Sequence, residues 1–411
     1  MIRIAILGHG VVGSGVAEVL LQNRDTITHK AGDTIEVKRI LDLRTFPDLP
    51  YADRFTTVFD DILGDDEIRI VVETMGGLTP AYDYVKACLL AGKSVVTSNK
   101  ELVAARGDEL LAIAKANNVN FMFEASVGGG IPILRPLDQC LAANEVTEIA
   151  GILNGTTNFM LTRMVQDGLD FDTALSMAQQ LGYAERNPAA DVEGHDACRK
   201  ICILASLAFG KHVYPDQVST EGITSLTPAD VRCADALNCV IKLIGSVRVQ
   251  GDKLQCLVAP MLIPKTSLLA DVNDVFNGIL VRGNAIGDVV FYGRGAGKLP
   301  TASAVVADVI DEARHLDSRK PLFWEAGAPD YVLNTADDSY AYLLRFTTDD
   351  KQALLNRLHE SLGDITEVTY AGMTADELAV RTPLIKTGAL EQALAALTDV
   401  TVVNRLRIAA L

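Results

Sequence analysis

The sequence is poor in features that mark special classes of protein, above all in positive charge. Its 411 residues include 37 Lys and Arg against 53 Asp and Glu, so the net charge is −16, and no run of basic residues interrupts the acidic background. Such a chain would repel a nucleic acid or an anionic membrane surface. Gly (32) and Pro (14) are close to average usage, which excludes fibrous and low-complexity classes. We therefore expect a folded, soluble protein with neither nucleic-acid nor membrane partners.

Long apolar runs are also missing. The longest run, residues 201–209, falls far short of the roughly 20 residues needed to span a bilayer. The apolar start, residues 1–7, is too short for a signal peptide and leads directly into a glycine turn, so we expect it to be a first strand.

Cysteine is sparse and follows no metal-binding pattern. The seven cysteines are odd in number and never form paired C-x-x-C motifs. Cys198 and Cys202 lie four apart in an apolar stretch, which is helical spacing. Buried, reduced thiols in a cytoplasmic protein are therefore favoured over metal ligands.

Three stretches of different pattern follow one another along the chain. Strand-like and helix-like segments alternate over about the first 125 residues, which is typical of the α/β class and of a Rossmann-type doubly wound parallel sheet. Longer helices, predicted at 158–181, 196–209 and 228–241, precede short strands between 245 and 292, so a second α+β domain is expected. Residues 339–411 show a strand-helix-strand-strand-helix-strand pattern, typical of a small α+β module. The predicted boundaries are 1–130 for the first domain, completed by 300–327, then 131–299 and 335–411.

A glycine-rich turn follows the first predicted strand. Gly8-His9-Gly10-Val11-Val12-Gly13 has the spacing G-x-G-x-x-G between a strand and a helix. In that context the first glycine permits a tight turn, the second lets a pyrophosphate approach the backbone, and the third lets helix and strand pack closely. The phosphate would face free N–H groups at the positive end of the helix dipole. The sequence therefore predicts a dinucleotide-binding turn, although an ordinary strand-to-helix turn can have the same residues.

Charged residues at the end of the second predicted strand bear on the choice between NAD and NADP. Asp42 stands where an acidic residue binds the 2′-hydroxyl of the adenosine ribose, which slightly favours NAD. Arg39 and Arg44 flank it, and either could accept the 2′-phosphate of NADP. The choice stays open, and Asp42 could also simply begin the following loop.

An acidic residue and a lysine lie at the start of the apolar helix predicted at 196–209. Asp196 and Lys200 are four apart and therefore neighbours on one helix face. For an isolated pair, a helix cap with a surface partner is the default interpretation. Here the lysine opposes the helix dipole and the helix is apolar on nearly every face, so we expect Lys200 to be partly desolvated. Desolvation lowers the pKa of an ammonium group, which suits proton exchange near neutrality, while Asp196 would hold the amine in position.

A second lysine is a weaker candidate. Lys100 follows the strand predicted at 94–97, at the edge where open α/β sheets bind ligands. A plain surface lysine is the alternative.

Seven segments together resemble the homoserine dehydrogenase family. They are residues 8–13, 71–77, 98–100, 124–132, 151–158, 182–200 and 295–302. They fall in the family's order and spacing over about residues 1–325, and Asn-Gly-Thr-Thr-Asn at 154–158 with Asp-x-x-x-Lys at 196–200 is the most specific part. The resemblance implies NAD(P)-dependent interconversion of L-aspartate 4-semialdehyde and L-homoserine, on the route to threonine and methionine.

The resemblance also implies roles for individual residues. Lys200 would donate a proton to the developing alkoxide, with Lys100 as its partner at the cofactor and substrate. The amino-acid end of the substrate would be held by Gly155, Thr156 and Glu185. Asp191 and Asp196 would line the pocket near the reacting end. Further cofactor contacts are implied for Thr74, Gly76, Lys100, Gly182, Glu185 and Gly297. These residue types suit the chemistry, because an α-ammonium group needs a carboxylate and a developing alkoxide needs cationic donors.

By the same resemblance, a loop after the first domain binds a monovalent cation. Glu124 and the carbonyl oxygens of Val127, Gly129 and Ile131 would be ligands of a sodium ion, whereas a glycine hinge is the alternative. The family forms dimers through its second domain, so a homodimer or a dimer of dimers is expected.

The C-terminal module resembles a regulatory ACT module. The Pro-Gly usually found in such a module is replaced here by Gln352-Ala353, so feedback binding of threonine stays open.

A second departure from the family lies after the pocket glutamate, where Asn187-Pro188 stands in place of the family's frequent Asp-Pro. One charge is therefore missing from that loop.

Two rival functions differ from the dehydrogenase in what they require. A non-catalytic dinucleotide or amino-acid sensor on the same fold would need no convergence of Lys100, Asp196 and Lys200 on the nicotinamide. Another semialdehyde or hydroxy-acid reductase would need no Glu185 to select an α-amino group. We favour the dehydrogenase.

Overall fold

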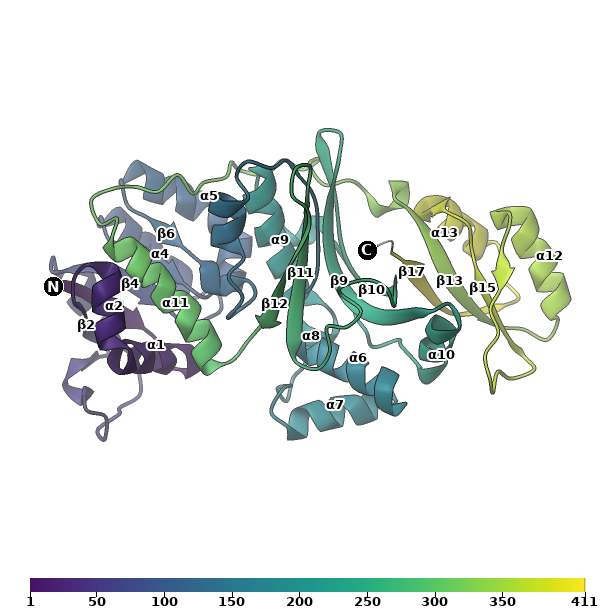
Figure 1. The fold of residues 1–411 in the computed structure, drawn as a ribbon, viewed down its shortest axis with the longest axis horizontal. Coiled ribbons are helices and arrows are strands. Elements are labelled where there is room, and N and C mark those ends of the chain that lie inside the picture. The colour runs from purple at the N-terminus through teal and green to yellow at the C-terminus, as the bar shows by residue number, and fades with distance from the viewer. Residues whose placement is uncertain (410) are drawn as a thin grey trace. The chain divides into compact units, whose positions relative to one another are not determined.

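The computed structural model describes residues 1–409 and 411, and the chain divides into two compact units (Figure 1). Unit 1 comprises Met1–Val146, Cys202–Pro215 and Gly293–Ala328. Unit 2 comprises Thr147–Ile201, Asp216–Tyr292 and Pro329–Leu411. No helix within the described residues is long and apolar enough to cross a membrane.

Unit 1 is built on a six-stranded parallel sheet in the order β3-β2-β1-β4-β5-β6. Its strands are β1 (Ile2–Leu7), β2 (Ile35–Leu41), β3 (Phe55–Thr56), β4 (Ile68–Glu73), β5 (Ser94–Thr97) and β6 (Phe121–Met122). The predicted doubly wound parallel sheet is therefore confirmed. The strand order reverses between β1 and β4, and sheets of this kind bind ligands at such a point, beyond the carboxyl ends of the strands.

Six helices belong to unit 1. They are α1 (Val11–Gln22), α2 (Arg24–Ala31), α3 (Asp60–Leu63), α4 (Ala81–Leu90), α5 (Lys100–Ala116) and α11 (Lys298–Ala313). The late helix α11 packs along α1 so closely that a Cβ on Gly15 would lie 3.0 Å from the Cβ of Ala302. Both helices contribute to one core with Ile4, Ile6 and Val72 of the sheet. Residues far apart in the sequence therefore complete this unit.

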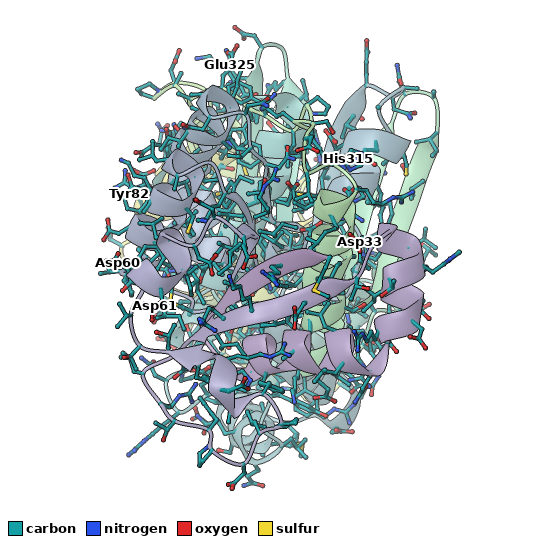
Figure 2. The ribbon with its side chains drawn as sticks, turned by 90° about the vertical axis from the view of Figure 1, so that its left-hand side faces the viewer. Asp33, Asp60, Asp61, Tyr82, His315 and Glu325 are labelled. Carbon is teal, nitrogen blue, oxygen red and sulfur yellow. The ribbon has the colours of Figure 1, made fainter. Side chains whose placement is uncertain are left out.

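The surface of unit 1 carries acidic side chains at a helix start. Asp60 and Asp61 are exposed in the first turn of α3, and Tyr82 of α4 is labelled beside them (Figure 2). Carboxylates in a first turn stabilise the helix through its dipole. The hydroxyl of Tyr82 donates to Glu109 at 2.6 Å, which ties α4 to α5.

Unit 2 contains an eleven-stranded mixed sheet with the main order β12-β11-β7-β9-β10-β17-β13-β15-β14. Its strands are β7 (Val146–Ile152), β8 (Ser219–Thr220), β9 (Cys239–Gln250), β10 (Lys253–Pro264), β11 (Phe276–Gly283), β12 (Gly287–Arg294), β13 (Ser339–Thr347), β14 (Thr366–Glu367), β15 (Glu377–Arg381), β16 (Ile385–Lys386) and β17 (Thr401–Ile408). The helices are α6 (Gly155–Asp167), α7 (Phe171–Gln180), α8 (Ala189–Val192), α9 (His195–Phe209), α10 (Pro228–Ala236), α12 (Lys351–Leu362) and α13 (Thr387–Ala395). The last part of α9, from Cys202, belongs to unit 1.

Three details of the predicted second domain are wrong. The helix expected at 158–181 is two helices, because Gly168 adopts a left-handed φ of 69° after α6 and the Asp170 side chain caps α7. The helix expected at 228–241 ends at Ala236, since Asn238 has a φ of 55° and β9 begins directly after it. The strands expected to be short include β9 and β10, each of 12 residues.

The C-terminal elements share a core with the rest of unit 2. Met261 and Leu262 of β10 pair in parallel with Arg407 and Ile408 of β17. Buried side chains of β10 and of β13 and α12 belong to one apolar cluster, which includes Met261, Ile263, Leu344 and Leu358. The predicted boundary between a second domain at 131–299 and a separate module at 335–411 stays a prediction. Residues from both of these ranges contribute to unit 2.

Candidate active site

The glycine turn of unit 1 is shaped by close backbone contacts. Gly8 has a left-handed φ of 90°, which favours glycine. A Cβ on Gly13 would overlap the Gly8 carbonyl oxygen and lie 2.7 Å from Oγ1 of Thr74, while a Cβ on Gly10 would meet nothing within 4 Å. Thr74 Oγ1 donates to the Gly8 carbonyl at 2.9 Å. The turn is therefore closed on the side of Gly13 and open at Gly10, the cap of α1, where helix N–H groups can meet an anion.

Asp42 is already engaged by the turn and by Arg44. Its Oδ2 accepts the backbone N–H of His9 at 2.7 Å, and Arg44 donates from Nε to Oδ1 and from Nη2 to Oδ2, both at 2.9 Å. The hydrogen bonds from Arg44 hold the pKa of the Asp42 carboxyl well below its usual range. The end of β2 thus presents a charged carboxylate and its guanidinium partner together.

The His9 side chain packs within unit 1. Its ring is 6% exposed and lies against Phe46 and Phe55, with centroids 4.7 and 5.1 Å away. Burial lowers the pKa of the imidazole. Its backbone N–H serves the Asp42 contact, so the side chain acts in packing.

A buried glutamate, which the sequence argument did not assign, orders the next loop of the same edge. Glu73 ends β4, is fully buried, and accepts the N–H groups of Met75 and Gly76 at 2.7 and 3.2 Å. Thr97, the last residue of β5, donates to its other oxygen at 2.6 Å. Burial raises the pKa of the Glu73 carboxyl. Lys100 begins α5 three residues beyond β5 and so lies at this carboxyl edge. Gly297 is the cap of α11 elsewhere in unit 1.

In unit 2, the predicted lysine and aspartate form a buried ion pair. Lys200 and Asp196 are 7% and 3% exposed, and Nζ of Lys200 donates to Oδ2 of Asp196 at 2.6 Å and to the Leu153 carbonyl at 2.7 Å. The expected desolvation of Lys200 is confirmed, although the lysine lies in the second turn of α9 rather than at its first residues. The amine is held between one carboxylate and one carbonyl.

Asn154 was missed by the sequence argument and lies at the centre of this cluster. Its Nδ2 donates to Asp191 at 2.7 Å and to Asp196 at 2.8 Å, and its Oδ1 accepts the N–H of Thr157 at 2.8 Å. The same side chain therefore caps α6 and joins two acidic residues from segments about forty positions away. The helix predicted to begin at 158 in fact begins at Gly155, directly after this Asn, which is a common cap residue.

The other residues predicted to bind the substrate lie at the start of α6 and in the turn between α7 and α8. Gly155 and Thr156 begin α6, and Thr156 Oγ1 donates to the Tyr183 carbonyl at 2.7 Å. Glu185, in the turn between α7 and α8, is exposed, and Gly182 precedes it. The hydrogen bonds that join Asn154, Asp196 and Lys200 do not reach the Glu185 carboxylate within the described residues.

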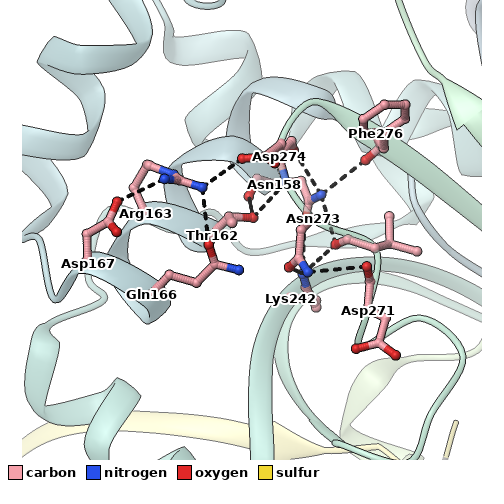
Figure 3. Close-up of polar contacts among 11 residues, drawn as sticks. Asn158, Thr162, Arg163, Gln166, Asp167, Lys242, Asp271, Asn273, Asp274 and Phe276 are labelled. Atoms are coloured by element: carbon pink, nitrogen blue, oxygen red, sulfur yellow. Dashed lines mark hydrogen bonds and ion pairs between the residues drawn. The ribbon is translucent and has the colours of Figure 1, made fainter.

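A second asparagine fixes the loop opposite the start of α6 (Figure 3). Asn158 Nδ2 donates to the carbonyls of Val272, Asp274 and Phe276 at 3.1, 3.0 and 3.1 Å. The buried Lys242 also donates to the Val272 carbonyl, at 2.5 Å. A Cβ on Gly155 would lie 2.7 Å from the Val275 carbonyl oxygen, so glycine is required where this loop meets the helix.

In the loop predicted to bind a cation, the Glu124 carboxylate accepts hydrogen bonds from the protein backbone. Glu124 is 5% exposed and accepts the N–H groups of Ile133, Leu134 and Arg135 at 2.7, 2.9 and 2.7 Å. A carboxylate has about four lone-pair positions, so three hydrogen bonds leave room for a further ligand. Within residues 1–409 and 411, the carbonyl oxygens of the other three predicted ligands accept no hydrogen bond; these are Val127, Gly129 and Ile131. The described residues contain no group of three or more His, Cys, Asp or Glu suited to a metal, so any ion here would depend on carbonyls.

Family models and known proteins match residues of both units. A family model described as "Homoserine dehydrogenase, NAD binding domain" matches residues 8–124, and one described as "Homoserine dehydrogenase" matches residues 132–310. The homoserine dehydrogenase of Synechocystis sp. is 48% identical over 320 residues, which cover 75% of this chain and 73% of that protein.

Solved structures extend the similarity over the whole chain. A homoserine dehydrogenase from Thiobacillus denitrificans superposes with a TM-score of 0.90 at 38% identity, covering 100% of this chain and 98% of that one. A hyperthermophilic archaeal homoserine dehydrogenase in complex with NADPH gives a TM-score of 0.64 at 28% identity, covering 76% of this chain and 97% of that one.

Proposed function

Because this chain belongs to the homoserine dehydrogenase family, we propose that Lys200, held by Asp196, is the proton donor and acceptor of its reaction. The activity is the NAD(P)-dependent interconversion of L-homoserine and L-aspartate 4-semialdehyde, in threonine and methionine biosynthesis. The observation that carries the proposal is the Lys200 amine, 7% exposed and within 2.6 Å of the Asp196 carboxylate.

Each proton step follows from the position of that amine. When bound, the nicotinamide cofactor would supply the hydride for reduction of the aldehyde carbon. Lys200 gives a proton from Nζ to the carbonyl oxygen, which would otherwise become an alkoxide in a site with little water. In the oxidative direction the neutral amine takes the hydroxyl proton of homoserine. Asp196 and the Leu153 carbonyl fix the direction of the amine in both cases.

The remaining predicted site residues would bind the substrate and the cofactor. Glu185 would pair with the α-ammonium group, Gly155 and Thr156 would contact the amino-acid end, and Asp191 would line the pocket. Lys100, Thr74, Gly76, Gly182 and Gly297 would contact the cofactor. The exposed position of the Glu185 carboxylate leaves it able to receive a charged group.

Replacing Lys200 tests the central proposal. We expect Lys200→Ala to lower kcat for homoserine oxidation by roughly a hundred- to ten-thousand-fold, the range of general acid–base catalysis. Lys253→Ala removes a partly exposed lysine of the same unit and should leave kcat unchanged. Activity of Lys200→Ala within a few fold of the parent protein would defeat the assignment.

We propose that the chain uses NAD and also accepts NADP. The ionised Asp42 carboxylate favours a ribose hydroxyl, while its partner Arg44 supplies a cation for a 2′-phosphate. An archaeal relative has been solved with NADPH. Arg44→Ala should raise KM for NADP about five-fold more than KM for NAD, as expected for loss of an exposed charge pair with a phosphate. Equal effects on both cofactors would contradict this role.

A sodium site at 124–131 is also proposed. Glu124 would contribute its remaining lone-pair positions, and Val127, Gly129 and Ile131 their carbonyl oxygens, all of them hard donors that suit Na⁺. The test is thermal unfolding of the full chain in NaCl against an equal concentration of tetramethylammonium chloride. A higher unfolding temperature in NaCl alone supports the site, and identical temperatures would refute it.

We propose an ACT-like regulatory module for residues 335–411. The proposal is supported by the chain order β13-α12-β14-β15-β16-α13-β17. It is also supported by the sheet order β17-β13-β15-β14, antiparallel throughout, which matches a split β-α-β arrangement. Calorimetric titration with L-threonine tests ligand binding.

A homodimer, or a dimer of dimers, is proposed as the assembly. Sedimentation at several protein concentrations would determine the oligomeric state.

A further inference from the structure

One edge of β10 in unit 2 makes two short pairings in succession. β8 pairs in parallel with Leu257 and Val258. The end of β17 pairs in parallel with Met261 and Leu262, and Figure 1 shows β17 beside β10. The N–H of Glu221, directly after β8, donates to the Val258 carbonyl at 2.8 Å. The segment after β8 and the C-terminal strand therefore meet on a single edge, although about 190 positions separate them in the sequence.

An ion pair between a buried arginine and a partly exposed glutamate joins the two segments at this junction. Arg407 of β17 is 4% exposed, and its Nη1 donates to Glu221 Oε1 at 2.9 Å. The guanidinium lies over the rings of Tyr340 and Tyr342 of β13, 5.7 and 5.9 Å from their centroids. Aromatic faces and a carboxylate both stabilise a desolvated guanidinium, so Glu221 is fixed from the C-terminal module.

The residue after Glu221 packs directly on the backbone that precedes α9. A Cβ on Gly222 would collide with the Val192 carbonyl oxygen and lie 2.6 Å from Cα of Glu193. The N–H of Ile223 donates to that same Val192 carbonyl at 2.8 Å. On the other side, a Cβ on Gly194 would lie 3.0 Å from Cγ2 of Thr220. Backbone meets backbone here, with no flexible side chain between the segments to absorb a displacement.

The segment held in this way lies between the two acidic residues of the site. Residues 192–195 connect Asp191 to Asp196, and Asn154 bonds both carboxylates. The Gly194 carbonyl accepts the N–H of Cys198, two residues before Lys200. Any shift of residues 192–194 therefore moves the carboxylate that directs the amine.

We infer that Glu221 and Arg407 are positioning residues, which hold the backbone between Asp191 and Asp196 so that Lys200 points correctly at the substrate. This inference rests on the proposed role of Lys200. It assigns the C-terminal module a part in catalysis that needs no bound effector. A purely structural role of the same ion pair would change the fraction of folded protein and leave the turnover of each folded molecule unchanged.

Kinetics on the full-length protein test the inference through a double-mutant cycle. The variants are Glu221→Gln, Arg407→Met and the double variant, with L-homoserine and NAD. We expect each single variant to lower kcat per folded molecule by roughly ten-fold, since small misplacements of catalytic groups are costly. KM for NAD should stay within about two-fold, and the double variant should be no slower than the slower single one, because the residues act together.

Two further variants make the test specific. Arg407→Lys retains a cation and should recover part of kcat. Arg357→Met removes the exposed Arg357–Asp399 pair, also in the C-terminal module, and should leave kcat unchanged. If Arg407→Met does not fold, Glu221→Gln decides the matter, because the Glu221 side chain is 32% exposed and its amide keeps the same shape.

The outcomes separate this inference from the proposed function. The positioning role is overturned if folded Glu221→Gln has the kcat of the parent protein. It is also overturned if the fold losses in kcat of the two single variants multiply in the double variant. Both conclusions hold even when Lys200→Ala is inactive. A Lys200→Ala protein that remains active overturns the proposed function first, and the positioning role with it.

Discussion

The two units build their candidate sites in opposite ways. In unit 1 the glycine turn is a backbone site, made by six consecutive residues whose shape depends on missing side chains at Gly8 and Gly13. In unit 2 the site is a side-chain network, in which Asn154, Asp191, Asp196 and Lys200 come from three separate segments. A backbone site is local and readable from sequence, whereas a network of side chains depends on how the whole unit packs.

The largest effect is expected from a substitution at the centre of the side-chain network in unit 2. Asn154→Ala removes the amide that joins Asp191 to Asp196 and the cap of α6, so we expect kcat to fall roughly a hundred-fold and stability by about 1 kcal/mol. Asn154→Asp keeps the capping oxygen but loses both donors. It should be at least as slow as the Ala variant and less stable, because a third carboxylate would then lie beside those of Asp191 and Asp196. Near-parental turnover in Asn154→Asp would show that the network is not needed.

An intermediate effect is expected at the glycine turn, where two neighbouring glycines differ. Gly13→Ala places a methyl group against the Gly8 carbonyl and should both destabilise unit 1 and raise KM for NAD, by roughly ten-fold or more. Gly10→Ala meets no atom within 4 Å and should raise KM without destabilising the unit. Fluorescence of Trp324 reports the stability of unit 1, because it is the single tryptophan and is buried there. Equal destabilisation by both variants would contradict the asymmetry of the turn.

The smallest expected effect is a pH dependence of the stability of unit 1. Burial raises the pKa of the Glu312 carboxyl from 4.5 to about 7. The folded state therefore holds this proton where the unfolded state has lost it. The stability of unit 1 should fall as pH rises from about 4.5 to 7 and change no further from this group above 7.

Glu312→Gln should remove that dependence and stabilise unit 1 at pH 8 by about 2 kcal/mol. Denaturant unfolding followed by Trp324 fluorescence at pH 5 and pH 8 measures it. The control is Asp317→Asn, whose side chain is 94% exposed and should have little effect. An unchanged pH slope in Glu312→Gln would show that this carboxyl is not the cause.

The contrast also explains how much could be predicted from sequence. The alternation of strands and helices predicted the parallel sheet of unit 1, since most of its strands follow from a local pattern. The resemblance in 154–158 and 196–200 identified the family and located Lys200. The role of Asn154 required its contacts with residues about forty positions later, which no spacing reveals.

Errors in the predicted helices have the same origin. Hydrophobic periodicity continues across Gly168 and Asn238, but left-handed backbone at both residues ends the helices there. The packing of Gly222 on residues 192–194 is likewise invisible in the sequence, because any glycine in a loop looks like a simple turn. Long-range backbone contacts decide these features.

The pairing of β17 with β10 has a consequence for synthesis of the chain. The strand that completes this sheet edge follows β10 by more than a hundred residues, so it leaves the ribosome long after β10 has emerged. Until β17 is made, β10 offers unpaired backbone groups beside an apolar surface, the kind of edge that pairs with other chains. Newly made molecules thus pass through a period of exposure to aggregation, between the emergence of β10 and that of β17.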